Sequence, residues 1–302
     1  MKESRTYKQN GPKAVILFHA FTGTPIDVAS VGRALERENY TVLMPTLDGH
    51  GEDDPDELFK YGIQDWVKTG NEAYQQLVND GYTDISVFGL SLGGIVATDV
   101  MLNNDVQTYG TFSSPVVAGR GSKVPENFWM WYKFKKKKLG VDEATIEANK
   151  EAVMERLDTI LSGINDHVRL MMKEYANVTL PVFIGQGGQD EMVDADIANT
   201  FREMLENADV DFHWYEDAPH VITTGRAGKE TQKDLLQFLE KHLYHKKIAL
   251  QNSQIQLSET SSTELKTKKL SQKNYFMTHI QKDISSLIRT KCKRLSTNLI
   301  VI

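Results

Sequence analysis

The sequence predicts an α/β protein whose mostly parallel β-sheet has helices on both faces and carries a small helical insertion. Three observations predict this fold class. Short apolar segments alternate with segments of helical spacing, the connections between them are short, and one long helical segment interrupts the alternation. Alternating strands and helices form parallel sheets with both faces covered. We therefore expect a functional site beyond the carboxyl ends of the strands.

Apolar runs bounded by turn residues define the expected strands. The first, Lys-Ala-Val-Ile-Leu-Phe, is rich in β-formers and typical of a buried strand. Together the runs predict strands at 13–18, 41–44, 84–88, 108–112, 181–185 and 211–215. Apolar residues at helical spacing, such as the stripe containing Trp66, Tyr74 and Leu77, predict helices at 26–38, 64–79, 94–103, 195–206 and 229–243.

Residues 113–179 interrupt this alternation and are too many for a plain loop. Apolar residues recur at helical spacing over 146–171, with Gly163 as a possible break, and an aromatic run precedes them. We expect a cap over the site, with Trp129 and Trp131 of the aromatic run lining the substrate pocket. The alternative is a packed helical insertion that contacts no ligand. The insertion divides the core into residues 1–112 and 180–248.

The C-terminal segment, residues 249–302, differs from the rest in charge. It holds nine Lys or Arg and three acids, a net charge of +6, so residues 1–248 carry 26 basic and 38 acidic residues, a net of −12. Such an acidic body repels phosphate, so we expect no nucleic-acid partner. Low apolar content over 249–275 predicts a basic extension without fixed structure. The alternative is a basic helix that touches an acidic surface.

Composition limits the remaining classes. No stretch approaches the roughly 18 uninterrupted apolar residues of a membrane span, so we expect no integral membrane segment. Residues 1–13 are polar and do not resemble a signal peptide, and the lone Cys292 fits a reducing cytoplasm. No phosphate loop, dinucleotide fingerprint or metal-ligand cluster is present, so we expect neither a cofactor nor a metal. The oligomeric state is not indicated.

Ser91 lies in the segment Gly-Leu-Ser-Leu-Gly at 89–93, directly between an expected strand and an expected helix. A serine in so sharp a turn is strained, and small residues two positions to each side let the backbones pass closely. Its hydroxyl then projects from the sheet edge at a helix N-terminus, which favours negative charge. In this context we interpret Ser91 as a nucleophile rather than as part of a mere tight turn.

A serine nucleophile needs a base, and His220 is the candidate among eight histidines. It follows the late strand 211–215, whereas His213 falls inside that strand and the others lie in helices, the insertion, the tail or early loops. A histidine base needs a carboxylate to fix its tautomer. Asp190 follows strand 181–185, with Asp194 and Asp196 as alternatives that better fit the start of the next helix.

Two backbone N–H groups must face the oxygen that becomes negative during attack. One should come from Leu92, which follows the nucleophile, and the other from the loop at 19–23 after the first strand. In that loop we choose Phe21, whose ring would also line the pocket, and we expect His19 to help shape the substrate site. The chain order Ser91, Asp190, His220 is that of α/β-hydrolases.

Five segments together resemble the bacterial carboxylesterase and monoacylglycerol-lipase branch of the α/β-hydrolases, especially its small thermostable-type carboxylesterases. They are His-Ala-Phe-Thr-Gly-Thr at 19–24, Asp-Gly-His-Gly at 48–51, Gly-Leu-Ser-Leu-Gly-Gly at 89–94, Gln-Asp-Glu-Met-Val at 189–193 and His-Val-Ile-Thr at 220–223. Spacing and order agree along about 12–243. Ala20 and Asp48 depart from the residues common in that family, and residues 249–302 match nothing in it.

The resemblance implies an α/β-hydrolase fold, a Ser-Asp-His triad and backbone donors at Phe21 and Leu92. It also implies hydrolysis of short- to medium-chain acyl esters, so a small-molecule ester is the expected partner. A monoacylglycerol lipase is the alternative within enzymes. The non-enzymatic alternative is an inactive binding protein on the same fold.

Overall fold

The computed structural model describes residues 7–242 together with Lys282. The chain divides into two units, Met1–His242 and Leu243–Ile302, and the fold and site below belong to the first. The expectation of a structureless extension over 249–302 falls outside the described residues, apart from Lys282. None of the helices in the described part is long and apolar enough to cross a membrane.

A seven-stranded sheet with the order β1-β3-β2-β4-β5-β6-β7 forms the centre of this unit. Its strands are β1 (Tyr7–Lys8), β2 (Lys13–Phe18), β3 (Tyr40–Leu43), β4 (Ile85–Leu90), β5 (Thr108–Phe112), β6 (Pro181–Gly187) and β7 (Asp209–Tyr215). All neighbours pair in parallel except β1, which is antiparallel to β3. The predicted mostly parallel sheet is confirmed, and the two-residue β1 was not predicted.

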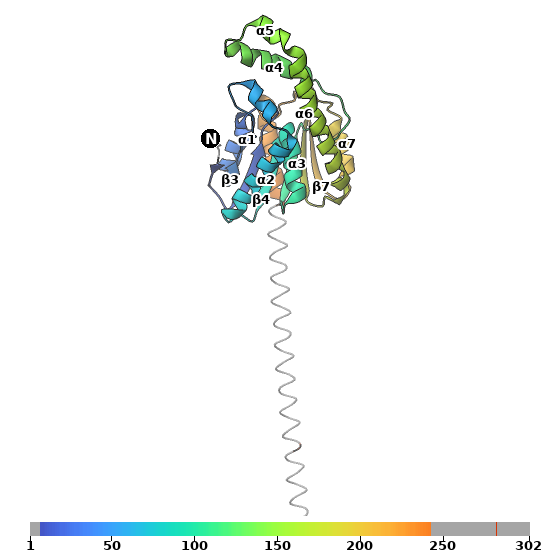
Figure 1. Ribbon diagram of the computed structural model, residues 1–302. Helices are drawn as coiled ribbons and strands as arrows, with labels where there is room; N and C mark the ends of the chain where they lie inside the picture. The colour runs from blue at the N-terminus through green and yellow to red at the C-terminus, as the bar shows by residue number, and fades with distance from the viewer. Residues whose placement is uncertain (1–6, 243–281, 283–302) are drawn as a thin grey trace, which may run out of the picture. The chain divides into compact units, whose positions relative to one another are not determined.

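Helices cover both faces of this sheet (Figure 1). They are η1 (Pro25–Asp27), α1 (Ala29–Arg37), η2 (Pro55–Lys60), α2 (Ile63–Asn79), α3 (Leu92–Asn103), α7 (Ile197–Met204) and the helical residues 225–242. Side chains alternate between the faces of a strand. Val87 of β4 therefore joins the core beneath α2 and α3, while the next residue, Phe88, packs edge-on against Phe238 of the last helix.

The insertion after β5 is helical. It comprises α4 (Val124–Lys138), α5 (Glu143–Ala148), α6 (Lys150–Met171) and η3 (Met172–Asn177). In Figure 1, α4 and α5 lie beyond one end of the sheet and α6 runs from them past α3. Near its C-terminus, α6 is fastened to α3, because His167 Nε2 lies 2.9 Å from Asp99 Oδ2. The expectation of a break at Gly163 is wrong, since α6 continues through that residue.

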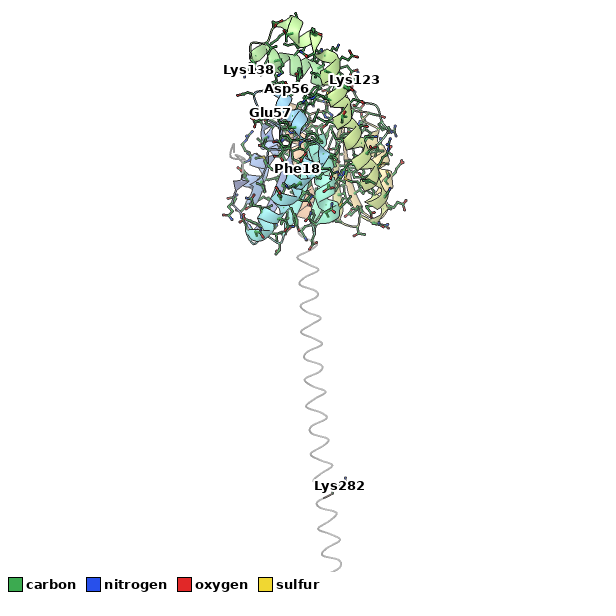
Figure 2. The ribbon with its side chains drawn as sticks, viewed as in Figure 1. Phe18, Asp56, Glu57, Lys123, Lys138 and Lys282 are labelled. Atoms are coloured by element: carbon green, nitrogen blue, oxygen red, sulfur yellow. The ribbon has the colours of Figure 1, made fainter. Side chains whose placement is uncertain are left out.

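The other end of the insertion is tied to the loop that contains η2. Lys136 Nζ lies 2.8 Å from Asp54 Oδ1 and 2.6 Å from Asp56 Oδ2, and the Tyr132 hydroxyl donates to Asp56 at 2.9 Å. Asp56 and Lys138 lie in the same part of the first unit (Figure 2). Lys136 therefore neutralises acidic side chains of this loop and ties α4 to it.

Candidate active site

Ser91 occupies the sharp turn between β4 and α3. Its backbone has φ 55° and ψ −118°, a left-handed conformation that L-residues rarely adopt and that costs about 1–3 kcal/mol. The flanking glycines explain why the chain can turn there. A Cβ on Gly89 would lie 2.0 Å from the Gly93 carbonyl, and one on Gly93 would lie 2.3 Å from the Phe18 carbonyl oxygen. The steric argument made from the sequence therefore holds in the structure.

His220 and Asp190 form a buried pair on the loops that follow β7 and β6. His220 Nδ1 lies 2.8 Å from Asp190 Oδ2, and the exposed fractions of the two side chains are 5% and 0%. Because a carboxylate only accepts, Nδ1 donates, and in the neutral ring Nε2 is left as the acceptor. That tautomer suits a base that must remove a proton from a hydroxyl.

The Asp190 carboxylate is fully hydrogen-bonded in its ionised form. Oδ1 accepts from the backbone N–H groups of Met192 and Val193, both at 2.9 Å, and Oδ2 accepts from Gln186 Nε2 at 3.0 Å as well as from His220. Burial by itself would raise the pKa of Asp190. The bond and charge of His220 and the two backbone donors outweigh burial and bring this pKa below its ordinary value.

Backbone contacts join the two loops that carry Asp190 and His220. The N–H of Gly188 donates to the Tyr215 carbonyl at 2.8 Å, and that of Gln189 donates to the Ala218 carbonyl at 2.9 Å. A Cβ on Gly187 would lie 2.2 Å from the Pro219 carbonyl oxygen, so the loops approach as closely as glycine allows. Main-chain contacts between the two loops therefore set the distance between Asp190 and His220.

Ser91, Leu92 and Phe21 line one cavity of about 510 Å³. Its apolar wall also includes Ile95, Val117, Leu161, Val168 and Ile197, and its polar groups include Arg120, Ser122, Asp158 and Asn165. Helix α6 supplies several of these residues, so the insertion forms part of the cavity wall. The structure thus brings the candidate nucleophile together with both residues chosen as backbone donors.

The backbone N–H groups of Leu92 and Phe21 are available to a ligand. Leu92 is the first residue of α3, so its N–H has no acceptor within the helix. Neither N–H donates to another group in the part of the chain that the structure describes. Two such donors beside a serine hydroxyl can stabilise a developing oxyanion, an effect worth about 3 kcal/mol per donor in other hydrolases.

His19 does not line this cavity, and its role is structural. Its Nδ1 donates to the Ala20 carbonyl at 2.8 Å and its Nε2 accepts from the Leu47 N–H at 3.1 Å, so both nitrogens are used. His19 is fully buried, and burial lowers its pKa to about 4. Because the first of these bonds holds the residue before Phe21 and the second ties the ring to Leu47, His19 fixes the loop that presents the Phe21 N–H.

Trp129 and Trp131 are also absent from the lining of the cavity, which corrects the expectation that they face the substrate. Trp129 is buried, stacks on Tyr132 and has Lys133 over its ring. Trp131 packs beside Phe128. The helical turn instead directs Phe128 of the same run toward the site, where it stacks on the Phe21 ring with centroids 5.9 Å apart. Periodicity located the helix but not the side that faces inward.

The acids and the histidine considered as alternatives contact other residues. Asp194 Oδ2 accepts from Arg120 Nη1 at 3.1 Å, and Asp196 precedes the first residue of α7. His213 lies between two carboxylates, with Asp211 3.1 Å from Nε2 and Asp234 3.3 Å from Nδ1. Among the described residues, no group of three or more His, Cys, Asp and Glu is arranged to hold a metal ion.

Two residues that contact the acid–base pair were not found from the sequence. Gln186 is buried in β6 and donates to Asp190, and its signal was a polar residue inside an otherwise apolar strand. Glu191 accepts from the backbone N–H of His220 at 3.0 Å, although sequence order alone suggests that it points away. Only the approach of two distant loops reveals this second contact.

A strained serine after a central parallel strand, with a carboxylate-bound histidine after the last strand, defines a hydrolase of the α/β type. The chain matches the family described as serine aminopeptidase, S33, over residues 9–226. It belongs to that family. The resemblance to the bacterial esterase branch of the α/β-hydrolases is confirmed.

Similar proteins include two from bacilli. A carboxylesterase of Bacillus subtilis is 29% identical over 236 residues, which is 78% of this chain and 95% of the relative. A thermostable monoacylglycerol lipase of a Bacillus species is 41% identical over 88 residues, or 29% of this chain and 34% of the relative.

Solved structures share the fold. One from a study of two metagenome-derived lipolytic enzymes aligns with a TM-score of 0.61 at 17% identity, covering 80% of this chain and 99% of the other. An esterase from Exiguobacterium antarcticum aligns with a TM-score of 0.57 at 15% identity, covering 78% and 99%. At these identities the likeness establishes the fold, in agreement with the α/β-hydrolase architecture predicted from the sequence.

Proposed function

We propose that this protein is a serine carboxylesterase that hydrolyses short- to medium-chain acyl esters through a Ser91–His220–Asp190 triad. The observation that carries the proposal is the cavity in which the strained Ser91 lies beside two unused backbone N–H groups, those of Phe21 and Leu92. The carboxylesterase of Bacillus subtilis, similar over nearly its whole length, supports the choice of an ester substrate.

The proposed reaction proceeds through an acyl-enzyme. The Ser91 oxygen attacks the ester carbonyl carbon while His220 Nε2 takes the hydroxyl proton, and the carbonyl oxygen becomes an oxyanion held by the N–H groups of Phe21 and Leu92. The C–O bond of the ester then breaks, and the alcohol leaves with the proton from His220. Water repeats these steps on the acyl-enzyme and releases the carboxylic acid. Asp190 stabilises the imidazolium through its 2.8 Å bond throughout.

The size and lining of the cavity support the proposal of short- to medium-chain acyl groups. Apolar residues from α3, the strand-to-helix connection and α6 form one wall, and a volume of about 510 Å³ accommodates a small apolar chain. Polar residues on the same cavity, Arg120 and Asp158 among them, are the observation that favours the alternative of a monoacylglycerol lipase, because a glycerol group needs hydrogen-bond partners. The similarity to a monoacylglycerol lipase over 88 residues points the same way.

The proposed chemistry uses no cofactor or metal, since every step is carried by side chains and backbone of this chain. We infer a cytoplasmic protein from the lone Cys292, because a single cysteine forms no internal disulfide and fits a reducing compartment. The net charge of −12 over residues 1–248 argues against a nucleic-acid partner.

The deciding experiment combines labelling with a substrate series. A fluorophosphonate probe should label the wild-type protein and fail to label a Ser91→Ala variant. Hydrolysis should then be measured on p-nitrophenyl esters from acetate to palmitate and on glycerol monoesters of matched length. Faster turnover of glycerol monoesters would select the lipase alternative, and absence of both labelling and hydrolysis would select the inactive binding protein.

A further inference from the structure

Two consecutive acidic residues accept hydrogen bonds from the same histidine, one from its ring and one from its backbone. Asp190 binds the ring of His220, while the Glu191 carboxylate accepts the backbone N–H of His220 at 3.0 Å. We propose that Glu191 is a positioning residue, which holds the main chain of the general base so that the ring of His220 can present Nε2 to Ser91. This inference rests on the proposed function, because it concerns how efficiently His220 serves as the base.

The segment around His220 needs such support. Residues 218–221 belong to no helix or strand, yet His220 itself is buried. Its neighbours are held on either side, since the Ala218 carbonyl accepts from Gln189 and the Ile222 carbonyl accepts from the Thr231 hydroxyl at 2.9 Å. Within the described residues, the bond to Glu191 is the one main-chain hydrogen bond that joins residues 219–221 to another loop.

The ring bond alone does not fix where Nε2 points. A single Nδ1–Oδ2 contact lets the imidazole pivot about that bond if the backbone of His220 shifts. A second anchor on the main chain limits this freedom, because ring and backbone are then held by adjacent residues of one loop. Displacing a catalytic group by about 1 Å costs up to a hundredfold in rate, so the loss of this anchor should be measurable in turnover.

The carboxylate could act through its hydrogen bond or through its charge, and substitutions separate the two. Glu191→Gln keeps an acceptor oxygen and removes the charge, whereas Glu191→Ala removes both. Asp217→Ala is the matched control, because Asp217 is an exposed acid of the same loop and donates or accepts no hydrogen bond in the described structure. All three changes remove one negative charge close to His220.

The experiment measures kcat and KM for p-nitrophenyl butyrate, together with the rate of fluorophosphonate labelling and the circular dichroism of each variant. E191A should lose about ten- to hundredfold in kcat with KM changed by less than about twofold, while E191Q and D217A stay within about twofold of wild type. If E191A does not fold, E191M carries the same prediction, because its side chain has the length but no acceptor oxygen.

The outcomes are distinguishable from failure of the proposed function. If wild type shows no Ser91-dependent hydrolysis, the proposed function fails, whatever the variants do. If wild type is active and E191A and E191M match it, Glu191 does not position the base. An E191Q loss equal to that of E191A would also overturn the proposal, because the charge and not the hydrogen bond would then be responsible.

Discussion

Thr223 donates its hydroxyl to the backbone carbonyl of Asp27 over 2.6 Å, joining two parts of the chain 196 residues apart. Thr223 follows His220 by three residues, and Asp27 belongs to η1, directly after the loop that contains Phe21. The hydroxyl is buried, since Thr223 has no exposed surface. This bond therefore links the loop of the candidate base to the loop of a candidate oxyanion donor.

Thr223→Val should weaken both the fold and the proposed reaction. The substitution keeps the shape of the side chain but leaves the Asp27 carbonyl without this donor, which costs about 1–2 kcal/mol of unfolding free energy. We expect urea unfolding to report that loss and kcat for p-nitrophenyl butyrate to fall. Thr223→Ser, which retains the hydroxyl, is the control and should recover most of both quantities. Equal behaviour of the two variants would show that the bond contributes nothing.

Ser91→Ala should abolish ester hydrolysis without unfolding the protein. Removal of a triad serine typically lowers turnover by several orders of magnitude, because no other group can form the acyl-enzyme. The Ser91 backbone, at φ 55°, is as strained for alanine as for serine, so the melting temperature should change little. Comparison of turnover and thermal unfolding tests this directly, and near-wild-type turnover in a folded Ser91→Ala variant would refute the mechanism.

The assignment of acid and base can be tested with paired variants. His220→Ala and Asp190→Asn should each lower kcat strongly, since the ring would be lost or held in the wrong tautomer. His213→Ala and Asp194→Asn should leave kcat within severalfold, because these residues bind Asp234 and Arg120 instead. A larger kcat loss for Asp194→Asn than for Asp190→Asn would reverse the choice of acid.

Acyl-length preference should depend on the part of α6 that faces the cavity. Leu161→Ala removes side-chain volume from the apolar wall and so enlarges the cavity. The ratio of decanoate to butyrate ester hydrolysis should therefore rise severalfold, because each additional buried methylene contributes about 0.8 kcal/mol. Leu170→Ala, on the same helix but 59% exposed, is the matched control. Trp131→Ala should leave the ratio unchanged, because Trp131 does not line the cavity. An unaltered ratio in Leu161→Ala would show that Leu161 takes no part in substrate selection.

Two buried histidines should make the fold sensitive to mild acid. Burial lowers the pKa of His19 from 6.5 to about 4, and burial followed by the nearby His19 lowers that of His50 to about 3. Below pH 6.5, His19 and His50 therefore become protonated in the unfolded chain while they stay neutral in the folded chain. Between pH 6.5 and about 4, each histidine should reduce the unfolding free energy by roughly 1 kcal/mol per pH unit, levelling off below the folded pKa.

Urea unfolding at pH 7, 6 and 5 measures this dependence. A His50→Phe variant should show a shallower decline over the same range, because one of the two groups no longer titrates. The replacement fits an aromatic site, since the His50 ring packs edge-on against Trp66 and Phe21. A decline identical to that of wild type would mean that His50 titrates alike in both states.

How far the site follows from the sequence differs from residue to residue. The sharp turn at Ser91 was predicted because it requires only local features. These are a strand before it, a helix after it and glycines two positions to each side, all within consecutive residues. The pairing of Asp190 with His220 could be expected from chain order, because parallel strands bring their carboxyl ends to one edge. Both inferences use periodicity and topology, which a linear sequence carries.

Other features depend on how distant segments meet. The sequence located the aromatic run in the insertion, but packing decided that Phe128 and not Trp131 faces Phe21, because the rotation of a helix about its axis is set by its neighbours. Likewise, the ion pairs of Lys136 in α4 with Asp54 and Asp56 depend on how the insertion packs against the η2 loop.

The sequence by itself therefore determined the sheet, the position of the insertion and the residue types available for chemistry, since these follow from local propensity and spacing. Only the tertiary structure decided that Glu191 reaches the backbone of His220 and that His19 holds a loop by accepting from the Leu47 N–H. The physical reason is that a hydrogen bond requires partners within about 3 Å. Residues some 30 positions apart reach that distance through packing of the whole sheet, which no local pattern encodes.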